Sequence, residues 1–414
     1  MSQKFVDSIH SQRSSMVSEA ALVFLQMLPA TMLTPAIRPL FQQFHSGNEH
    51  AMHAFMAINM LGAVLAVPII GAWAQRSSRP QRIIAYLLAA DALLLGIMAS
   101  PLSLYTLLTL RFLEGACHVS ATALLLAQIA SHAKSRGKAH AMGVAGAALM
   151  FAVALGSGVG GQLVAYGPRF PFFGAALIQL MTLTLLIASR LPDLPLVART
   201  RLRPIAFLRE HPALRVPIAA TFVGRFTVGC IIVTFALFVH RYHGGSDRAV
   251  GMMFMLLTLS FALSMYPLSR LSDRVPRATL MGLGGAVYAV SLAAIAIVPF
   301  GTLPAVMVIA GVSSSALFAP ALCYGAVLGG ERKEMAMSLI NVAGCLGMLF
   351  GPAAAGIMSA ALGKQDPIIG YRAAFMLGAG SVALWLALSL PWLVRQLRAE
   401  AQETAVTNHA SSHL

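Results

Sequence analysis

Three ionisable side chains inside one apolar stretch are spaced so that they could hold and pass on a proton. Arg111, Glu114 and His118 recur at intervals of three and four residues within residues 103–129, and a helix would place them, with Gly115, along one face. Charged groups inside an apolar helix are costly and are normally retained for function. Glu114 is therefore a candidate proton-coupling acid, with Arg111 as its charge partner and His118 as a relay. The alternative is an Arg111–Glu114 pair that neutralises itself and braces the fold.

Three further ionisable residues lie in other apolar stretches. Asp91 is either a second proton site or a hydrogen-bonding group between helices. Glu19 lies close to the beginning of its stretch, where we expect water to reach it, and is an alternative proton site. Arg225 and Thr221, which lies one turn earlier on the same face, are candidates for the substrate cavity. Arg225 has no acidic residue near it in sequence. It needs a partner from another helix or an anionic substrate, unless it is a structural cation near a helix end.

Uncharged polar residues in the apolar stretches are candidates to line a substrate cavity, or else to hydrogen-bond one helix to another. These candidates are Gln26, Thr31, Thr34, Ser314 and Tyr324.

The elements that must position these residues are membrane-spanning helices. The composition, with 58% apolar and 10% charged residues and a mean hydropathy of +0.76, excludes a soluble globular domain. A helix needs about 20 apolar residues to cross a bilayer core of roughly 30 Å, and twelve stretches meet this requirement. They are residues 18–41, 53–74, 82–100, 103–129, 140–165, 170–190, 214–239, 249–269, 278–299, 303–328, 336–361 and 371–394. We therefore predict an all-α polytopic membrane protein.

The distribution of positive charge predicts its orientation. With both termini in the cytoplasm, the cytoplasmic segments hold most of the 29 Lys and Arg residues, as the positive-inside rule requires. The net charge of +15 is spread over every such segment, which favours contact with anionic lipid over nucleic-acid binding. The polar first seventeen residues lack the apolar core of a cleavable signal peptide.

The chain divides into two halves at a charged, proline-containing connection. We predict an N-terminal six-helix bundle over 1–190, a cytoplasmic linker over 191–213, a C-terminal six-helix bundle over 214–394 and a cytoplasmic tail over 395–414. Two motifs recur in order, one copy in each half, which indicates an internal repeat.

The first repeated motif is a basic loop after the second helix of each half. Its copies contain Gly71, Gln75, Arg76 and Arg79 in the first half and Asp273, Arg274 and Arg277 in the second. The second motif is a run of small residues that would let helices approach closely. It contains Gly156, Gly160 and Gly161 in the first half and Gly351, Pro352 and Gly356 in the second.

Together with Arg111 and Gly115, these motifs resemble the major facilitator superfamily, and within it the twelve-helix drug:proton antiporters. The resemblance implies two pseudo-symmetric six-helix bundles around a cavity lined by helices 1, 4, 7 and 10. It also implies a cytoplasmic latch at the basic loops, where a carboxylate meets a helix N-terminus. Gln75 stands where the family has Asp, so we expect the second-half copy with Asp273 to be the stronger latch.

The functional hypothesis is a secondary transporter of the bacterial inner membrane that exports small amphipathic molecules by proton-coupled antiport. No phosphate-binding loop, nucleophile triad or metal-ligand spacing is found in the sequence, so we expect no enzyme activity, cofactor or metal. We expect small-molecule substrates, protons and membrane lipid as partners, and a monomer. The alternatives are transport of an anionic metabolite or siderophore, and a non-transporting scaffold or sensor.

Overall fold

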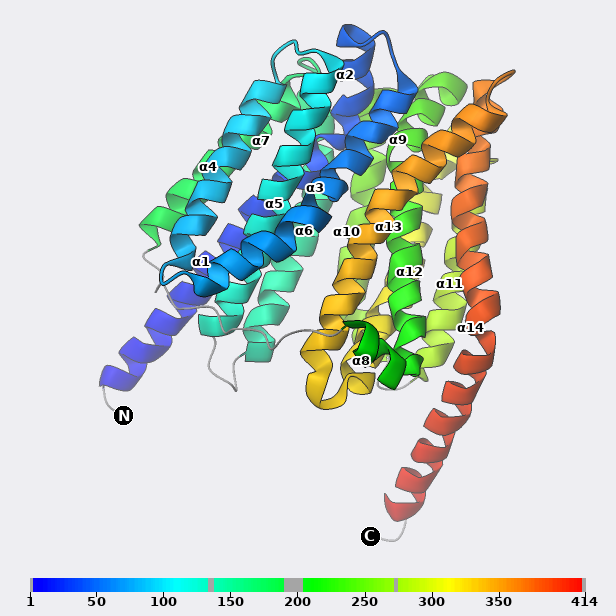
Figure 1. Ribbon diagram of the computed structural model, residues 1–414. Helices are drawn as coiled ribbons and strands as arrows, with labels where there is room; N and C mark the ends of the chain where they lie inside the picture. Colours follow the sequence, from blue (N-terminus) through cyan, green and yellow to red (C-terminus); the bar gives the residue numbers. More distant parts are fainter. Residues whose placement is uncertain (1–2, 133–137, 190–203, 272–274, 412–414) are drawn as a thin grey trace. The chain divides into compact units, whose positions relative to one another are not determined.

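The computed structural model describes residues 3–132, 138–189, 204–271 and 275–411, and in these ranges the regular structure is helical (Figure 1). The helices are α1 (Gln3–Met32), α2 (Ile37–Phe44), α3 (Glu49–Arg76), α4 (Pro80–Met98), α5 (Leu104–His132), α6 (Lys138–Val164), α7 (Phe170–Ala188), α8 (Pro204–Glu210), α9 (Arg215–His243), α10 (Asp247–Leu271), α11 (Arg277–Ile295), α12 (Leu303–Leu328), α13 (Lys333–Leu362) and α14 (Pro367–Ser411).

Local sequence signals explain where several helices begin and end. The Asn48 side chain accepts a hydrogen bond of 3.1 Å from the backbone N–H of Ala51 and so caps α3. Pro80 occupies the first turn of α4, where its missing N–H costs nothing. After α9 the chain turns at Gly244, whose φ of 64° favours glycine.

Twelve helical segments of the described chain are long and apolar enough to cross a membrane, which confirms the predicted all-α polytopic fold. The first runs from Val17 to Phe44 and combines α1 and α2 through a 3₁₀ turn at Thr34–Ala36. The ends of the others lie within five residues of the predicted ones, and some coincide with them. Large apolar side chains such as Ile69, Ile357 and Leu388 are exposed on these helices, as expected for surfaces that lipid covers.

The chain forms two compact units. Unit 1 contains residues 1–200 and 244–255, and unit 2 contains residues 201–243 and 256–414. The helix α10 therefore contributes residues to both. The predicted linker 191–213 lies partly outside the described residues. The rest of it contains α8 and the beginning of a 3₁₀ turn at Pro212–Leu214.

The same neighbour relations occur inside each unit. In unit 1, α1 packs against α6 and α7, and α4 packs against α5 and α7 (Figure 1). In unit 2, α9 packs against α13 and α14, and α11 packs against α12 and α14. Since α9 is the first spanning helix of the second half, five helices of each unit follow one scheme of contacts.

Small residues permit the closest of these helix crossings. A Cβ added at Gly156 or Gly160 of α6 would collide with backbone oxygens of α1. A Cβ added at Gly161 would lie 3.1 Å from Gly251 Cα within unit 1. In unit 2, Gly351 and Pro352 pack against Gly229 of α9. The buried Gly356 lies one turn further along α13.

Candidate functional site

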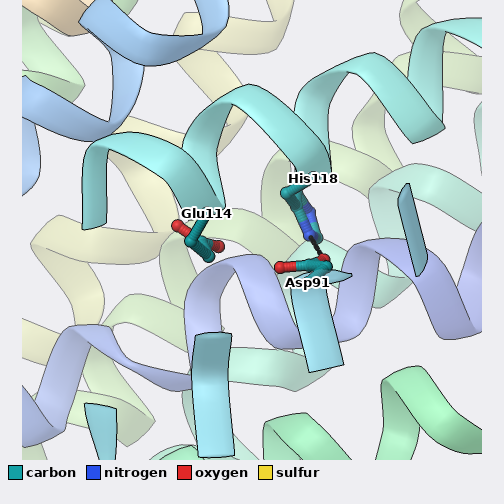
Figure 2. Close-up of side chains that lie close together, drawn as sticks. All are labelled: Asp91, Glu114 and His118. Carbon is teal, nitrogen blue, oxygen red and sulfur yellow. Dashed lines mark hydrogen bonds and ion pairs between the residues drawn. The ribbon is translucent and has the colours of Figure 1, made fainter. Parts of the chain in front are cut away.

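A buried polar cluster in unit 1 brings together four of the predicted proton-coupling residues, Asp91, Arg111, Glu114 and His118. Glu114 and His118 project from the same face of α5, and Asp91 reaches His118 from α4 (Figure 2). The side chains are almost completely enclosed, with exposed fractions of 0% for Asp91, 3% for Glu114 and 4% for His118. Burial of several ionisable groups in one place requires that they neutralise and hydrogen-bond one another.

The Glu114 end of the cluster is an ion pair reinforced by an amide. Arg111 Nη1 and Asn59 Nδ2 both donate to Glu114 Oε2 at 2.6 Å. The guanidinium also lies over the ring of Phe55, 4.8 Å from its centre. Gly115 makes this arrangement possible, because a Cβ there would collide with the backbone of Asn59 and push α3 away from α5.

The Asp91 end of the cluster is built around an imidazole. His118 Nδ1 lies 2.8 Å from Asp91 Oδ2, so a proton on this nitrogen is donated to the carboxylate. The side-chain amide of Gln179, on α7, donates to the same oxygen. Gln26, on α1, donates to the backbone oxygen of His118 at 3.1 Å. Four helices thus meet at this pair.

The cluster has unused capacity for a proton. Asp91 Oδ1 and His118 Nε2 are buried and have no hydrogen-bond partner among the described residues. These two atoms leave positions at which the Asp91–His118 pair can bind a proton, whereas Glu114 Oε2 already accepts hydrogen bonds from Arg111 and Asn59. The net charge of the cluster changes by one unit with each proton bound.

Donor atoms of Asp91, Glu114 and His118 lie within 4.8 Å of one another, a separation that could suit a metal ion. However, the guanidinium of Arg111 already contacts Glu114 Oε2. A fixed positive charge at this distance opposes a divalent cation, so the arrangement suits a proton better than a metal.

One predicted environment is wrong. We expected water to reach Glu19, but its exposed fraction is 6%, and it has an interaction partner in the folded chain. Its position near the beginning of the first span suggested solvent. The face of α1 on which it lies is enclosed by protein instead, and distance along the sequence carries no information about that face.

Other predicted cavity residues of unit 1 bond helix to helix or lie buried. Thr31 Oγ1 donates to the backbone oxygen of Val153, on α6, at 2.8 Å. Thr34 is buried in the 3₁₀ turn after α1. Gln26 is part of the polar cluster described above.

Arg225 in unit 2 is half-buried on α9, with its guanidinium 5.5 Å from the ring centre of Phe318 on α12. As expected, Thr221 shares its face. Both side chains lie against Gly344 of α13, where an added Cβ would be 3.4 Å from Arg225 Cγ and 3.5 Å from Thr221 Cγ2. Thr221 Oγ1 donates to the carbonyl one turn earlier at 3.1 Å.

The two remaining cavity candidates of unit 2 differ in environment. Ser314 is half-buried and donates to the backbone oxygen of Gly311 at 3.0 Å. Tyr324 is buried, with its ring edge-to-face against Trp392 at 5.0 Å.

The first basic loop is largely exposed. Arg76 and Arg79 are exposed and Gln75 is half-buried, and a Cβ at Gly71 would meet no atom within 4 Å. In the second copy, Arg277 is the first residue of α11. The remaining two residues of that copy, Asp273 and Arg274, lie outside the described residues.

Two features of unit 1 were not predicted. The first feature is that Asn59 and Gln179 complete the cluster. Both are amides within apolar stretches of their helices, which was the available signal. The second feature is a two-pronged ion pair between Arg38 and Asp247, with N–O distances of 2.8 and 2.6 Å. No sequence pattern pairs two residues 209 positions apart.

Comparison with known proteins agrees with this architecture. The family model described as Major Facilitator Superfamily matches residues 20–218 and again residues 217–411. "Multidrug resistance protein 2" of Bacillus subtilis (strain 168) is 22% identical over 392 residues, which cover 91% of this chain and 96% of that protein.

Two solved structures share the fold at low sequence identity. An inward-facing bacterial homologue of the human lysosomal transporter Spinster superposes with a TM-score of 0.77 at 15% identity, over 94% of this chain and 97% of that one. The nucleoside transporter NupG gives 0.72 at 12% identity, over 91% and 98%. The family model covers nearly the whole sequence in two consecutive matches, so the chain is a multi-pass membrane protein that belongs to the Major Facilitator Superfamily of transporters.

Proposed function

We propose that this transporter exports small amphipathic organic molecules across the bacterial inner membrane in exchange for protons. In this proposal its two six-helix halves alternate between inward-open and outward-open states, with both termini in the cytoplasm. The protein acts as a monomer in contact with lipid, and transport rather than a chemical reaction on the substrate is its activity.

The observation that carries the proposal is the sealed cluster of Asp91, Glu114, Arg111 and His118. A buried cluster that changes charge when a proton enters or leaves will favour different surroundings in its two states. That differential stability is what a proton gradient needs in order to bias a conformational equilibrium. The similarity to a protein named for multidrug resistance supports amphipathic compounds as the substrate class and export as the direction.

The test is proton flux in liposomes that contain the purified protein and an internal pH dye. A panel of cationic, neutral and anionic amphiphiles is added in turn, and at least one is expected to trigger proton movement. Glu114→Gln and Asp91→Asn should each abolish this movement. Asp366→Asn, which removes an acid that only caps the beginning of α14, should leave it unchanged.

Three outcomes separate the alternatives. Normal flux in both cluster variants would exclude the cluster as the coupling site. Movement of a compound without protons would favour facilitated diffusion. A protein that moves neither compounds nor protons under any gradient would favour a scaffold or sensor.

A further inference from the structure

Arg225 lies near the middle of a candidate span of unit 2, and it has no counter-ion among the residues that the structure describes. It is 13 residues into the candidate span Pro212–His243, roughly 20 Å along the helix axis. Its guanidinium faces the ring of Phe318 and forms no hydrogen bond or ion pair with any residue that the structure describes.

Two arginines of the described chain that are more completely buried than Arg225 each have an acidic partner. Arg111 is paired with Glu114, and Arg38 is paired with Asp247. A guanidinium in an apolar protein interior is normally matched by an anion. The absence of such a match at Arg225 is therefore a local exception that calls for an explanation.

The chain offers few candidates for the missing negative charge. The acidic residues of unit 2 all lie outside its candidate spans, and they are Glu210, Asp273, Glu331, Glu334, Asp366, Glu400 and Glu403. The ionisable groups close to the guanidinium are the Cys345 thiol and the Tyr288 hydroxyl, which are uncharged at neutral pH in their ordinary range.

The buried acids of unit 1 are already engaged. Asp91 and Glu114 are held inside the polar cluster, and Asp247 is held by Arg38. Glu19 also has an interaction partner. Among the acidic residues whose surroundings the structure describes, none is left to pair with Arg225, and a ligand is a further source of an anion.

The surroundings of Arg225 suit an amphipathic anion. Arg225 and Phe318 are both half-buried rather than sealed, so a ligand can reach them. Phe318 supports one face of the guanidinium and leaves its N–H fork available to a carboxylate or sulfonate. The stacked rings of Phe222 and Phe226, 6.0 Å apart on the same helix, add aromatic surface nearby.

We propose that Arg225 and Phe318 form a binding subsite for the carboxylate or sulfonate group of an aromatic amphipathic substrate. This inference rests on the proposed transport function, since it names the class of compound that the transporter carries. It predicts that an acid binds better than a neutral molecule of the same shape.

Equilibrium binding to the purified protein in phospholipid-free detergent tests the subsite without any transport. Titration calorimetry compares 2-naphthoate with its isosteric amide, 2-naphthamide. The wild-type protein should bind the acid at least about tenfold more tightly, because hydrogen bonds to charged groups are the strong ones. Equal affinities for acid and amide in the wild type would overturn the subsite, whatever the variants do.

Substitutions test whether Arg225 is responsible for the preference for the acid over the amide. Arg225→Gln should bring the affinity ratio close to one, and Arg225→Lys should keep only part of it, because lysine retains the charge but not the planar fork. Arg241→Gln removes a cation from the same helix that is held 2.7 Å from the Tyr371 hydroxyl, and it should leave the ratio unchanged. A tenfold ratio that persists in Arg225→Gln would overturn the assignment.

Anionic lipid is the competing source of the same chemistry. Phosphatidylglycerol added to the micelles in equimolar amount should not displace 2-naphthoate, and displacement that requires Arg225 would show a lipid site instead.

Measurements of flux in liposomes distinguish the binding subsite from the proposed transport function. Acid binding without any proton-coupled transport refutes the transport proposal alone. Proton-coupled transport of neutral compounds with no acid preference refutes the subsite alone.

Discussion

Replacement of Glu114 by Gln should destabilise the protein far more than the loss of one ion pair suggests. Glu114 and Arg111 are each 3% exposed and lie 2.6 Å apart. Without the carboxylate, the guanidinium stays buried with a neutral amide and the face of Phe55 against it, and its charge is uncompensated. An uncompensated buried charge of this kind costs about 3–5 kcal/mol of unfolding free energy.

The assay is reversible unfolding in mixed micelles by titration with SDS, followed by circular dichroism. A matched control is Glu210→Gln, because Glu210 pairs with Arg332 at the same 2.6 Å but with both side chains more than half exposed. Solvent screens that pair, so its loss should cost less than about 1 kcal/mol.

The double variant Arg111→Gln with Glu114→Gln distinguishes a stranded charge from lost packing. With no buried charge left, it should be more stable than Glu114→Gln alone. A loss below about 1 kcal/mol in Glu114→Gln, or a double variant less stable than the single one, would refute this reasoning.

Three further predictions concern other parts of the chain. Gly160→Val should cost several kcal/mol of unfolding free energy, because its side chain would collide with the backbone of α1, whereas Gly146→Ala on the same helix, with no atom within 4 Å, should be close to neutral in the same SDS titration. Asp247→Asn should lower the free energy of unfolding by about 3 kcal/mol, because Arg38 loses its charge partner. The double variant Arg38→Asp with Asp247→Arg, which exchanges the two charges, should recover part of that loss in a thermal melt. Burial lowers the pKa of His45, so the folded protein binds a proton at this residue less readily than the unfolded chain does. The stability of the fold should therefore fall as the pH is lowered through 6.5, and His45→Gln should reduce that fall. A pH profile of the melting temperature that is the same in the variant and the wild type would contradict this.

Much of the fold follows from the sequence because lipid imposes one simple requirement on the chain. Each spanning segment must be helical and about 20 residues long, so the apolar stretches alone locate the twelve helices. The ends of the helices are predicted less accurately than their number. In α9 the candidate span continues to His243, whereas the predicted stretch ends at residue 239. Polar aromatic and basic residues at the end of this helix resemble a loop in composition.

Only part of the candidate site can be predicted from the sequence. Arg111, Glu114 and His118 share a helix, so helical periodicity predicts that they lie on one face. Asp91, Asn59 and Gln179 come from three other helices, and which faces of those helices meet α5 depends on packing. The same limitation hid the Arg38–Asp247 pair, whose members are far apart in sequence and close only in the folded chain.

The buried charges on α5 also have a consequence for how the protein is made. This helix has the lowest mean hydropathy of the twelve candidate spans, so it is the poorest substrate for the insertion machinery when it emerges alone. Asn59 and Asp91 lie earlier in the chain and are already synthesised at that moment, whereas Gln179 follows later. Insertion of α5 into the membrane should therefore require that α3 and α4 remain next to the translocon. In a nascent chain that lacks them, α5 should be translocated across the membrane instead of inserted.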